Sequence, residues 1–138
     1  MTEGGFPEPN APLTHILVVS DIEASRRFYS DVLGAKLFRE YGGTSAVYEF
    51  LGAWLLLVTS GGPTRDKPSI TMAPPADPDQ VSAAFTIRVN DCRAVYDALA
   101  ARGAEFITPP YASEGGHEIR CFFRDPDGHL FEISEYNA

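Results

Sequence analysis

The pattern of apolar and polar positions is repeated once along the chain. Each copy begins with a short apolar strand, continues through a helix that ends at a glycine, and closes with further strands. The expected strands of the first copy are His15–Val19, Ala35–Tyr41, Thr44–Tyr48 and Trp54–Thr59, and those of the second are Ala84–Val89, Ala104–Ile107, Ile119–Arg124 and Leu130–Tyr136. Each copy is therefore expected to fold as a βαβββ module.

Each module is expected to hold one helix between its first two strands. Ser20, with Glu23 three residues later, fits a capping box, and Asn90 is expected to cap the second helix. Gly34 and Gly103 stand where a residue of positive φ commonly ends a helix. The two copies are offset by about 70 residues, which identifies an internal repeat.

The repeat divides the chain into a tail, two modules and a linker. Residues 1–12 are rich in proline, glycine and glutamate and are expected to form a flexible tail. A single domain, 13–136, contains module one (13–60) and module two (83–136). The linker, 61–82, carries five prolines, which block strand pairing, although Ile70–Met72 could form a short edge strand.

Composition restricts the classes of function. The chain has 138 residues, of which 44% are hydrophobic, so it can bury a core. Its formal net charge of −8 argues against nucleic acid or an anionic membrane as a partner. Cys92 and Cys121 lack CxxC or zinc spacing, and no disulfide framework is expected. Neither a signal peptide nor a membrane-spanning stretch is recognisable, so a cytoplasmic protein is expected.

The last expected hairpin places a carboxylate in the middle of a strand. Residues 125–128, Asp-Pro-Asp-Gly, have the composition of a turn between two strands. Glu132, between Phe131 and Ile133, must face water, a partner or a ligand site, because an unpaired charge inside a sheet is costly. A strand with one wet face is the simpler interpretation, and a ligand site is the alternative.

Two stretches resemble the vicinal oxygen chelate superfamily, which includes glyoxalase I, bleomycin-resistance proteins, fosfomycin-resistance enzymes and extradiol dioxygenases. The first is HILVVSDIEASRRFYSDVLGAKL, similar to the opening strand and helix of the family, and the second is RDPDGHLFEISEY, similar to its closing hairpin. The resemblance implies an α+β fold of two βαβββ modules whose paired sheets form a concave cavity. It also implies a homodimer, because related small chains pair their sheets across subunits.

The resemblance further implies four metal-ligand positions, two of which keep a donor. His15 and Glu132 match, whereas the equivalent positions hold Phe85 and Leu56, which cannot bind a metal. Since a catalytic metal usually has three protein ligands, no tightly bound cofactor is expected. A weak divalent-metal site at His15 and Glu132 is the alternative. His15 could also be a strand histidine that only packs on its neighbours.

Strand alternation, combined with the resemblance, predicts the side chains that line the cavity. The expected ligand-binding residues are Tyr48, Trp54, Phe85, Glu118, Arg120 and Phe122. Arg120 could bind an anion or a carbonyl group of a ligand, or it could only pair with Glu118 or Glu132. In the absence of a metal, Glu132 could serve as the catalytic general base.

The expected function is to bind or convert a small organic molecule in an apolar, aromatic cavity without a tightly bound metal. The alternative is a divalent-metal-dependent lyase or dioxygenase that uses His15 and Glu132. Whether the protein is an enzyme, which would then be a glyoxalase-like lyase or a dioxygenase, does not follow from these residues.

Overall fold

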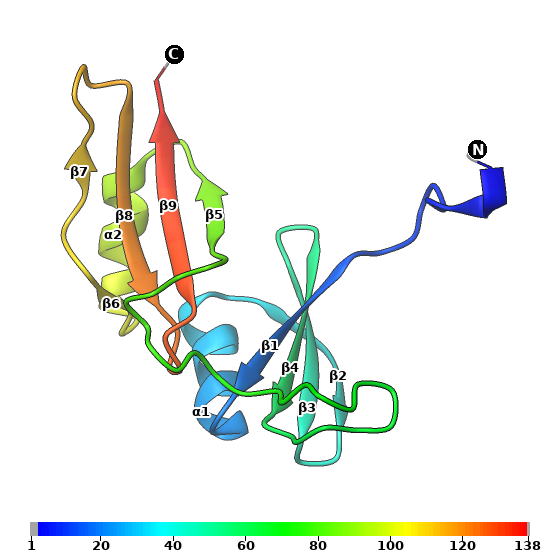
Figure 1. Ribbon diagram of the computed structural model, residues 1–138. Coiled ribbons are helices and arrows are strands. Elements are labelled where there is room, and N and C mark those ends of the chain that lie inside the picture. Colours follow the sequence, from blue (N-terminus) through cyan, green and yellow to red (C-terminus); the bar gives the residue numbers. More distant parts are fainter. Residues whose placement is uncertain (1–2, 138) are drawn as a thin grey trace.

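A four-stranded sheet and a five-stranded sheet, in which four strands follow the same order, form the framework of the protein (Figure 1). The computed structural model describes residues 3–137. The strands of sheet one, in spatial order, are β1 (Thr14–Val19), β4 (Ala53–Thr59), β3 (Ser45–Phe50) and β2 (Lys36–Tyr41). Those of sheet two are β5 (Phe85–Arg88), β9 (Leu130–Tyr136), β8 (Glu118–Arg124) and β6 (Glu105–Phe106), and the short β7 (Tyr111–Ala112) also pairs with β8.

The pairing of the strands confirms the α+β fold of two βαβββ modules. In each sheet the first strand runs parallel to the last, β1 to β4 and β5 to β9, and the remaining pairs are antiparallel. Each module has one helical segment. In module one, α1 (Ile22–Arg27) continues into a π-helical turn, η2 (Phe28–Val32), and in module two the helix is α2 (Cys92–Ala101).

The helix caps differ from the sequence prediction by one residue. Asp21, not Ser20, caps α1, and its Oδ1 accepts hydrogen bonds from the backbone N–H groups of Glu23 and Ala24. Asp91, not Asn90, caps α2. A carboxylate is the stronger acceptor and also complements the positive end of the helix dipole, so it prevails over its neighbour.

The ends of the helices agree with the prediction. Gly34 follows the first helical segment with φ of +73°, and Gly103 follows α2 with φ of +106°. The predicted flexible tail contains a 3-10 turn, η1 (Glu3–Gly5), and the next strand begins at Thr14. Residues 1 and 2 of that tail lie outside the described residues.

The two modules share a core. Its buried members in the sheets include Leu17, Val19, Leu55, Leu57, Phe123, Phe131 and Ile133. Tyr29, which follows α1 in module one, is completely buried and lies 6.2 Å from the ring of Phe131 in module two. Its hydroxyl donates a 2.7 Å hydrogen bond to Asp125 at the β8–β9 turn. This contact joins the modules, because it connects the helix of one to the last hairpin of the other.

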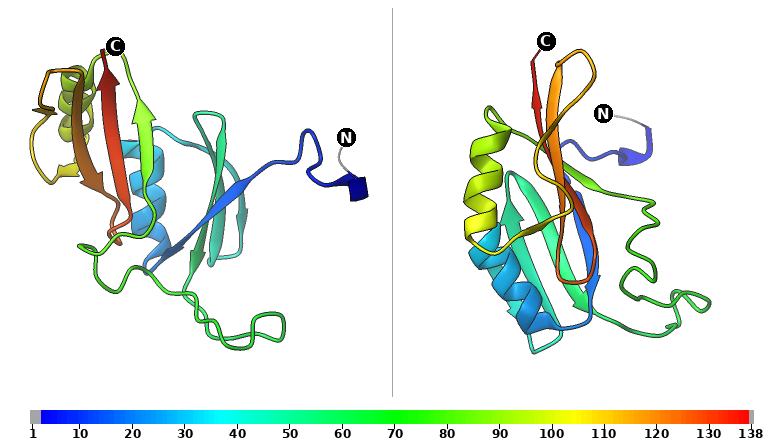
Figure 2. Two further views of the ribbon diagram at one scale, coloured as in Figure 1. Left: turned by 45° about the horizontal axis from the view of Figure 1, so that its top comes forward. Right: turned by 90° about the vertical axis from the view of Figure 1, so that its left-hand side faces the viewer.

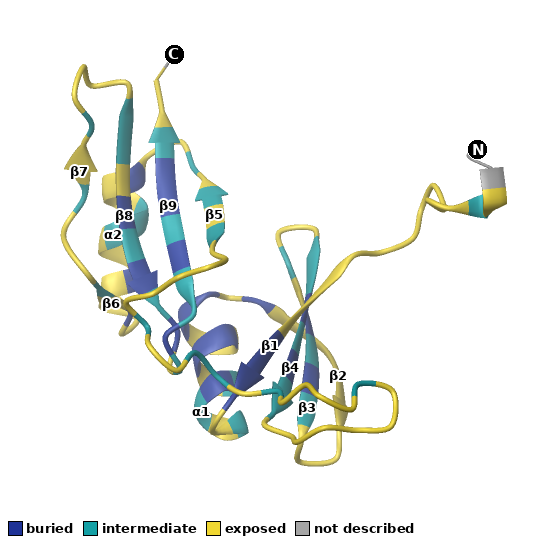
Figure 3. Cartoon of the chain, viewed as in Figure 1, coloured by how far each residue is buried: buried dark blue, intermediate teal, exposed yellow. Residues whose placement is uncertain are grey.

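The linker crosses sheet two on the side that α2 does not cover. Residues 60–84, all of them described, form no helix or strand, and the predicted strand Ile70–Met72 is reduced to one bridge between Gly61 and Met72. Figures 1 and 2 show the helices on one side of sheet two and the linker on the other. Figure 3 shows that the linker is largely exposed.

The two cysteines lie side by side in the core of module two. Both are buried, and their sulfur atoms are 3.7 Å apart as free thiols. Burial raises the pKa of Cys121 to about 12, so this thiol is protonated at neutral pH. No helix among the described residues has the length and apolar character needed to cross a bilayer.

Candidate ligand-binding site

The face of sheet two turned away from α2, called here the open face, carries the candidate site. In β9, Phe131 and Ile133 are buried toward α2, so Glu132 lies on the opposite face. In β8, Cys121 and Phe123 are buried in the same way. The predicted alternation of these two strands is therefore confirmed. The side chains on the open face include Glu118, Arg120, Phe122, Glu132 and Ser134.

A polar cluster occupies this face and consists of Thr86, Glu118, Arg120, Glu132 and Ser134. One Nη atom of Arg120 lies 3.8 Å from a carboxylate oxygen of Glu118 and 3.8 Å from one of Glu132. The other oxygen of Glu118 accepts a 2.6 Å hydrogen bond from the Ser134 hydroxyl. The other oxygen of Glu132 accepts one from the Thr86 hydroxyl. Each carboxylate is thus held between a hydroxyl group and the shared guanidinium.

The cluster carries a formal excess of negative charge, because two carboxylates face one guanidinium. The Arg120 side chain is 48% exposed, compared with 24% for Glu118 and 16% for Glu132. At 3.8 Å neither ion pair is a hydrogen bond, so the facing carboxylate oxygens keep lone pairs for another donor. The guanidinium carbon of Arg120 also lies 5.8 Å from the ring centroid of Phe122, so an aromatic side chain borders the polar cluster.

The structure corrects the predicted position of Tyr48. Tyr48 is completely buried on the helix-facing side of sheet one, and its hydroxyl lies 3.0 Å from the Ser30 hydroxyl. Strands β3 and β4 are longer than predicted, and only Leu51 and Gly52 connect them. This short turn pairs Tyr48 with the buried Leu55. Tyr48 therefore belongs to the core and not to a ligand site.

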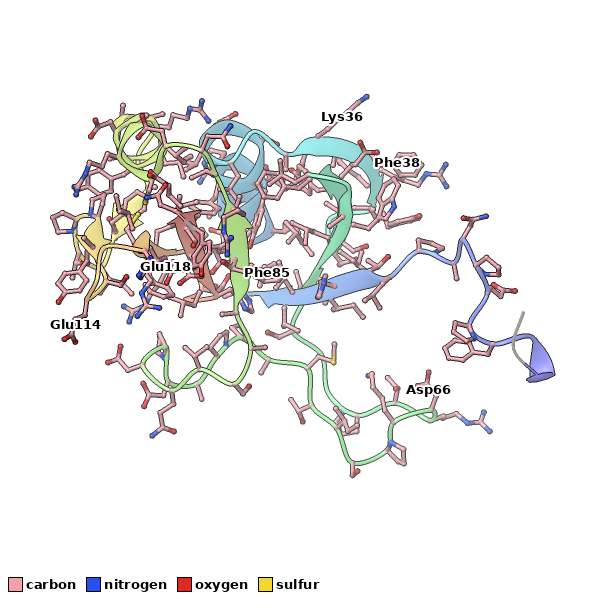
Figure 4. All side chains as sticks on the ribbon, turned by 90° about the horizontal axis from the view of Figure 1, so that it is seen from above. Lys36, Phe38, Asp66, Phe85, Glu114 and Glu118 are labelled. Atoms are coloured by element: carbon pink, nitrogen blue, oxygen red, sulfur yellow. The ribbon has the colours of Figure 1, made fainter. Side chains whose placement is uncertain are left out.

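Phe85 and His15 also face the helix side of their sheets. Phe85 pairs with Phe131 and stacks on its ring at 4.8 Å, and the His15 ring contacts Phe85 at 5.2 Å. His15 pairs with the helix-facing Leu55. His15 therefore lies on the helix-facing side of sheet one, whereas Glu132 lies on the open face of sheet two. The structure does not bring the two predicted metal ligands together. Figure 4 shows Phe85 beside β1, at the edge of sheet two.

Thr86 is the functional candidate that the sequence analysis missed. It lies on the open face because it follows Phe85, and it pairs directly with Glu132. The alternation of apolar and polar residues in β5, with Phe85 and Ile87 half-buried between exposed Thr86 and Arg88, was the signal for it. Trp54 is placed on sheet one, where its ring packs against Phe38 at 5.1 Å.

Comparison with known proteins decides the family. The sequence pattern of the Glyoxalase/Bleomycin resistance protein/Dioxygenase superfamily matches residues 12–133. The chain belongs to this superfamily. Among curated proteins it is 32% identical to the metallothiol transferase FosB of Lysinibacillus sphaericus, over 88% of this chain and 79% of the relative. It is 29% identical to the lactoylglutathione lyase of Haemophilus influenzae, over 87% of this chain and 88% of that protein.

Solved structures agree with the assignment to the superfamily. A glyoxalase/bleomycin resistance protein/dioxygenase from Nocardioides superposes with a TM-score of 0.68 and 26% identity, covering 92% of this chain and 83% of its own. The lactoylglutathione lyase from Agrobacterium tumefaciens gives a TM-score of 0.66 at 20% identity, covering 93% and 95% of the two chains. The second likeness supports the fold alone.

The donor set on the open face does not fit a metal centre. Among residues 3–137 no group of three or more His, Cys, Asp or Glu side chains is arranged to hold a metal ion. The two carboxylates that lie close together, Glu118 and Glu132, share the guanidinium of Arg120 between them. A cation bound by both carboxylates would have to displace this side chain.

Two hollows flank the β8–β9 turn, and neither is lined by the residues predicted to form the cavity. One, of about 680 Å³, lies against the end of α2 and β6 and includes Arg124 and Asp125. The other, of about 420 Å³, lies between the linker and the start of β9 and includes Leu130. Leu130 shares the open face with Glu132, so the second hollow adjoins the polar cluster.

Proposed function

We propose that this member of the superfamily binds a small organic molecule through an amine or another hydrogen-bond donor on the open face of sheet two. We also propose that it does so without a tightly bound metal ion. The observation that supports this function is the position of Arg120 between Glu118 and Glu132. The carboxylate oxygens remain available as hydrogen-bond acceptors. The positive charge of Arg120, which an anionic ligand would need, is already neutralised by the two carboxylates.

Charge favours a cationic ligand over an anionic one. The polar cluster has one more carboxylate than guanidinium groups, and the whole chain has a formal net charge of −8. Both features repel a carboxylate or phosphonate approaching the open face and attract an ammonium group. The anion-binding role considered for Arg120 is therefore the less favoured of its two predicted roles.

A second candidate function is conversion of the bound molecule rather than binding alone. The curated relatives named above are a transferase and a lyase. Glu132, oriented by Thr86, would then act as the general base, because one of its oxygens remains available to a ligand proton. A metal-dependent reaction at His15 and Glu132 is less favoured, since His15 is on the helix-facing side of sheet one and Glu132 is on the open face of sheet two.

The homodimer predicted from the resemblance fits the surface of sheet one. Exposed apolar side chains gather on this module: Ile16, Leu37, Phe38, Tyr41 and Leu51. A second copy of the chain would remove them from water. Light scattering at micromolar concentration should give the mass of a dimer, and a stable monomer would contradict this part of the proposal.

Two probes with the same aryl chain and opposite charges test the proposed function. The amide NMR signals of the protein are followed during titration with 3-phenylpropylamine and with 4-phenylbutyrate. The amine is expected to shift the signals of Thr86, Glu132 and Ser134, and the carboxylate is expected to leave them unchanged. In the Glu132→Gln variant the amine should bind about tenfold more weakly, since a hydrogen bond to a charged group is lost. Preference for the carboxylate, or no shift with either probe, would overturn the proposal.

A further inference from the structure

The linker is attached to the open face at two points near the β8–β9 turn. Asp79 of the linker accepts a 2.6 Å hydrogen bond from the guanidinium of Arg124, the last residue of β8. Pro78 packs against Gly128 so closely that a Cβ atom on the glycine would lie 2.9 Å from the Cβ of the proline. These contacts hold the second half of the linker near one end of sheet two. Figure 1 shows this part of the chain passing that end of the sheet.

The hollow of about 420 Å³ lies under this part of the linker. Its lining is mixed: the apolar part comes from Ala73, Pro75, Ala76, Val81, Ala83 and Leu130, and the polar part includes Asp77 and His129. The volume falls within the range of about 300–1,000 Å³ that is common for small-molecule sites. Leu130 precedes Glu132 by two residues on the same face, so the hollow begins about 7 Å from the polar cluster along β9.

We propose that the linker forms the second half of the ligand site and binds the apolar end of the ligand. This inference rests on the proposed function, because it assumes that the donor end of the ligand lies at Glu132. A molecule that fills both halves has an ammonium or similar donor group separated from an aromatic or branched aliphatic group by a short chain. The expected substrate class is therefore that of the arylalkylamines. The linker, which has no regular structure, selects the size of the apolar group.

The contact between Asp79 and Arg124 provides the means of testing this role. The Asp79→Ala variant removes the ion pair that holds the linker to β8, one of its two attachments, without touching the polar cluster. Asp66→Ala is the matched control, because it removes the same charge from the same linker. Asp66 bonds to Thr64 within the linker and lies far from Glu118 (Figure 4). A difference between the two variants therefore reports the position of the linker and not its charge.

The experiment compares 3-phenylpropylamine with n-propylamine, which lacks the aryl group, by amide NMR titration of the three proteins. In the wild type the aryl compound should bind about tenfold more tightly, since part of a phenyl ring is buried. It should also shift the signals of Val81 and Ala83. In Asp79→Ala the ratio of the two affinities, aryl compound to n-propylamine, should fall to about two. Asp66→Ala should keep the wild-type ratio. The affinity for n-propylamine should change no more in Asp79→Ala than in Asp66→Ala.

The possible failures of the two proposals differ. If both amines bind at Glu132 with equal affinity, or if Asp79→Ala keeps the full ratio, the role of the linker is refuted and the proposed function stands. If neither amine shifts the signals of the polar cluster, the proposed function is refuted and this inference with it.

Discussion

The hydroxyl of Tyr29 donates a hydrogen bond to Oδ2 of Asp125, and both residues are buried where the two modules meet. The other carboxylate oxygen of Asp125 accepts hydrogen bonds from the backbone N–H groups of Asp127 and His129. The same side chain thus shapes the β8–β9 turn and attaches it to module one. Since Glu132 and Leu130 follow this turn directly, Asp125 also positions the candidate site.

The Tyr29→Phe variant should lower the free energy of unfolding by about 1–3 kcal/mol, the cost of leaving a buried polar group without its partner. Tyr111→Phe is the control, because Tyr111 is 69% exposed. Urea unfolding of the two variants should show the loss only at Tyr29. Equal stability of the two variants would show that the hydrogen bond contributes nothing to the junction.

The buried carboxyl of Asp125 should make stability depend on pH in a direction opposite to that of most carboxylates. Burial, the largest influence, raises its pKa above the usual value near 3.8, although the charge of His129 and the hydrogen bonds act the other way. The folded state therefore binds this proton more tightly than the unfolded state does. The resulting stabilisation is present at low pH and is lost as the pH rises through the folded-state pKa.

The Asp125→Asn variant isolates this effect, since asparagine keeps a side-chain oxygen for the two backbone N–H groups and cannot ionise. The free energy of unfolding of the wild type, minus that of the variant, should decrease as the pH rises from about 4. Subtraction in matched buffers cancels the contributions of the other carboxylates. A difference that increases with pH would mean that Asp125 is stabilised as a carboxylate.

Gly128 should not tolerate a side chain while Pro78 of the linker packs against the β8–β9 turn. Gly128→Ala would add a Cβ atom 2.9 Å from Pro78 at a residue with φ of +98°. Gly116→Ala is the control, since Gly116 also has a positive φ, +72°, but no atom close to the added Cβ. Hydrogen exchange should become faster in residues 73–83 of Gly128→Ala only. Equal exchange in both variants would contradict the contact between Pro78 and the turn.

Metal analysis tests the proposal that no metal ion is tightly bound. Protein purified without chelator and then dialysed is expected to retain well below one equivalent of zinc, iron, manganese or nickel. The reason is that Arg120 already occupies the space between the two neighbouring carboxylates, and a site of two ligands is weak. Retention of about one equivalent would contradict this expectation, and Glu118 and His117 would then be the first residues to test as ligands.

The repeated modules and the glycines that end the helices could be predicted because their signals are local. Apolar residues with a period of 3.6 or two residues distinguish a helix from a strand. The positive φ needed where a helix ends is best met by glycine, which predicts the roles of Gly34 and Gly103. The helix caps were predicted one residue early, because the pairs Ser20-Asp21 and Asn90-Asp91 each offer two good capping residues. In the first pair the backbone N–H of Ser20 also donates a hydrogen bond to Oδ1 of Asp127, a tertiary contact that no local pattern predicts.

The faces of the strands were harder to predict than the strands themselves. Segment β3, SAVYEF, has apolar residues at both parities, so its pattern does not fix which side is buried. The repeat correctly matched His15 with Phe85, since these residues pair with Leu55 and Phe131, but both were assigned to the wrong face. The position of the linker could not be predicted, because Asp79 and Arg124 are distant in sequence and no periodicity connects them.

The open face is proposed to carry a net negative site for a donor group, and the Arg120→Met variant tests this charge balance. This change keeps a similar volume and removes the positive charge that competes with a cationic ligand. The measurement is the affinity of 3-phenylpropylamine for the variant and the wild type, with melting temperature as a check of folding. Binding should become tighter by about threefold, since exposed ion pairs are worth up to about 1 kcal/mol. Weaker binding of the amine, or tighter binding of 4-phenylbutyrate to the wild type than to the variant, would contradict the proposed function and make Arg120 an anion anchor.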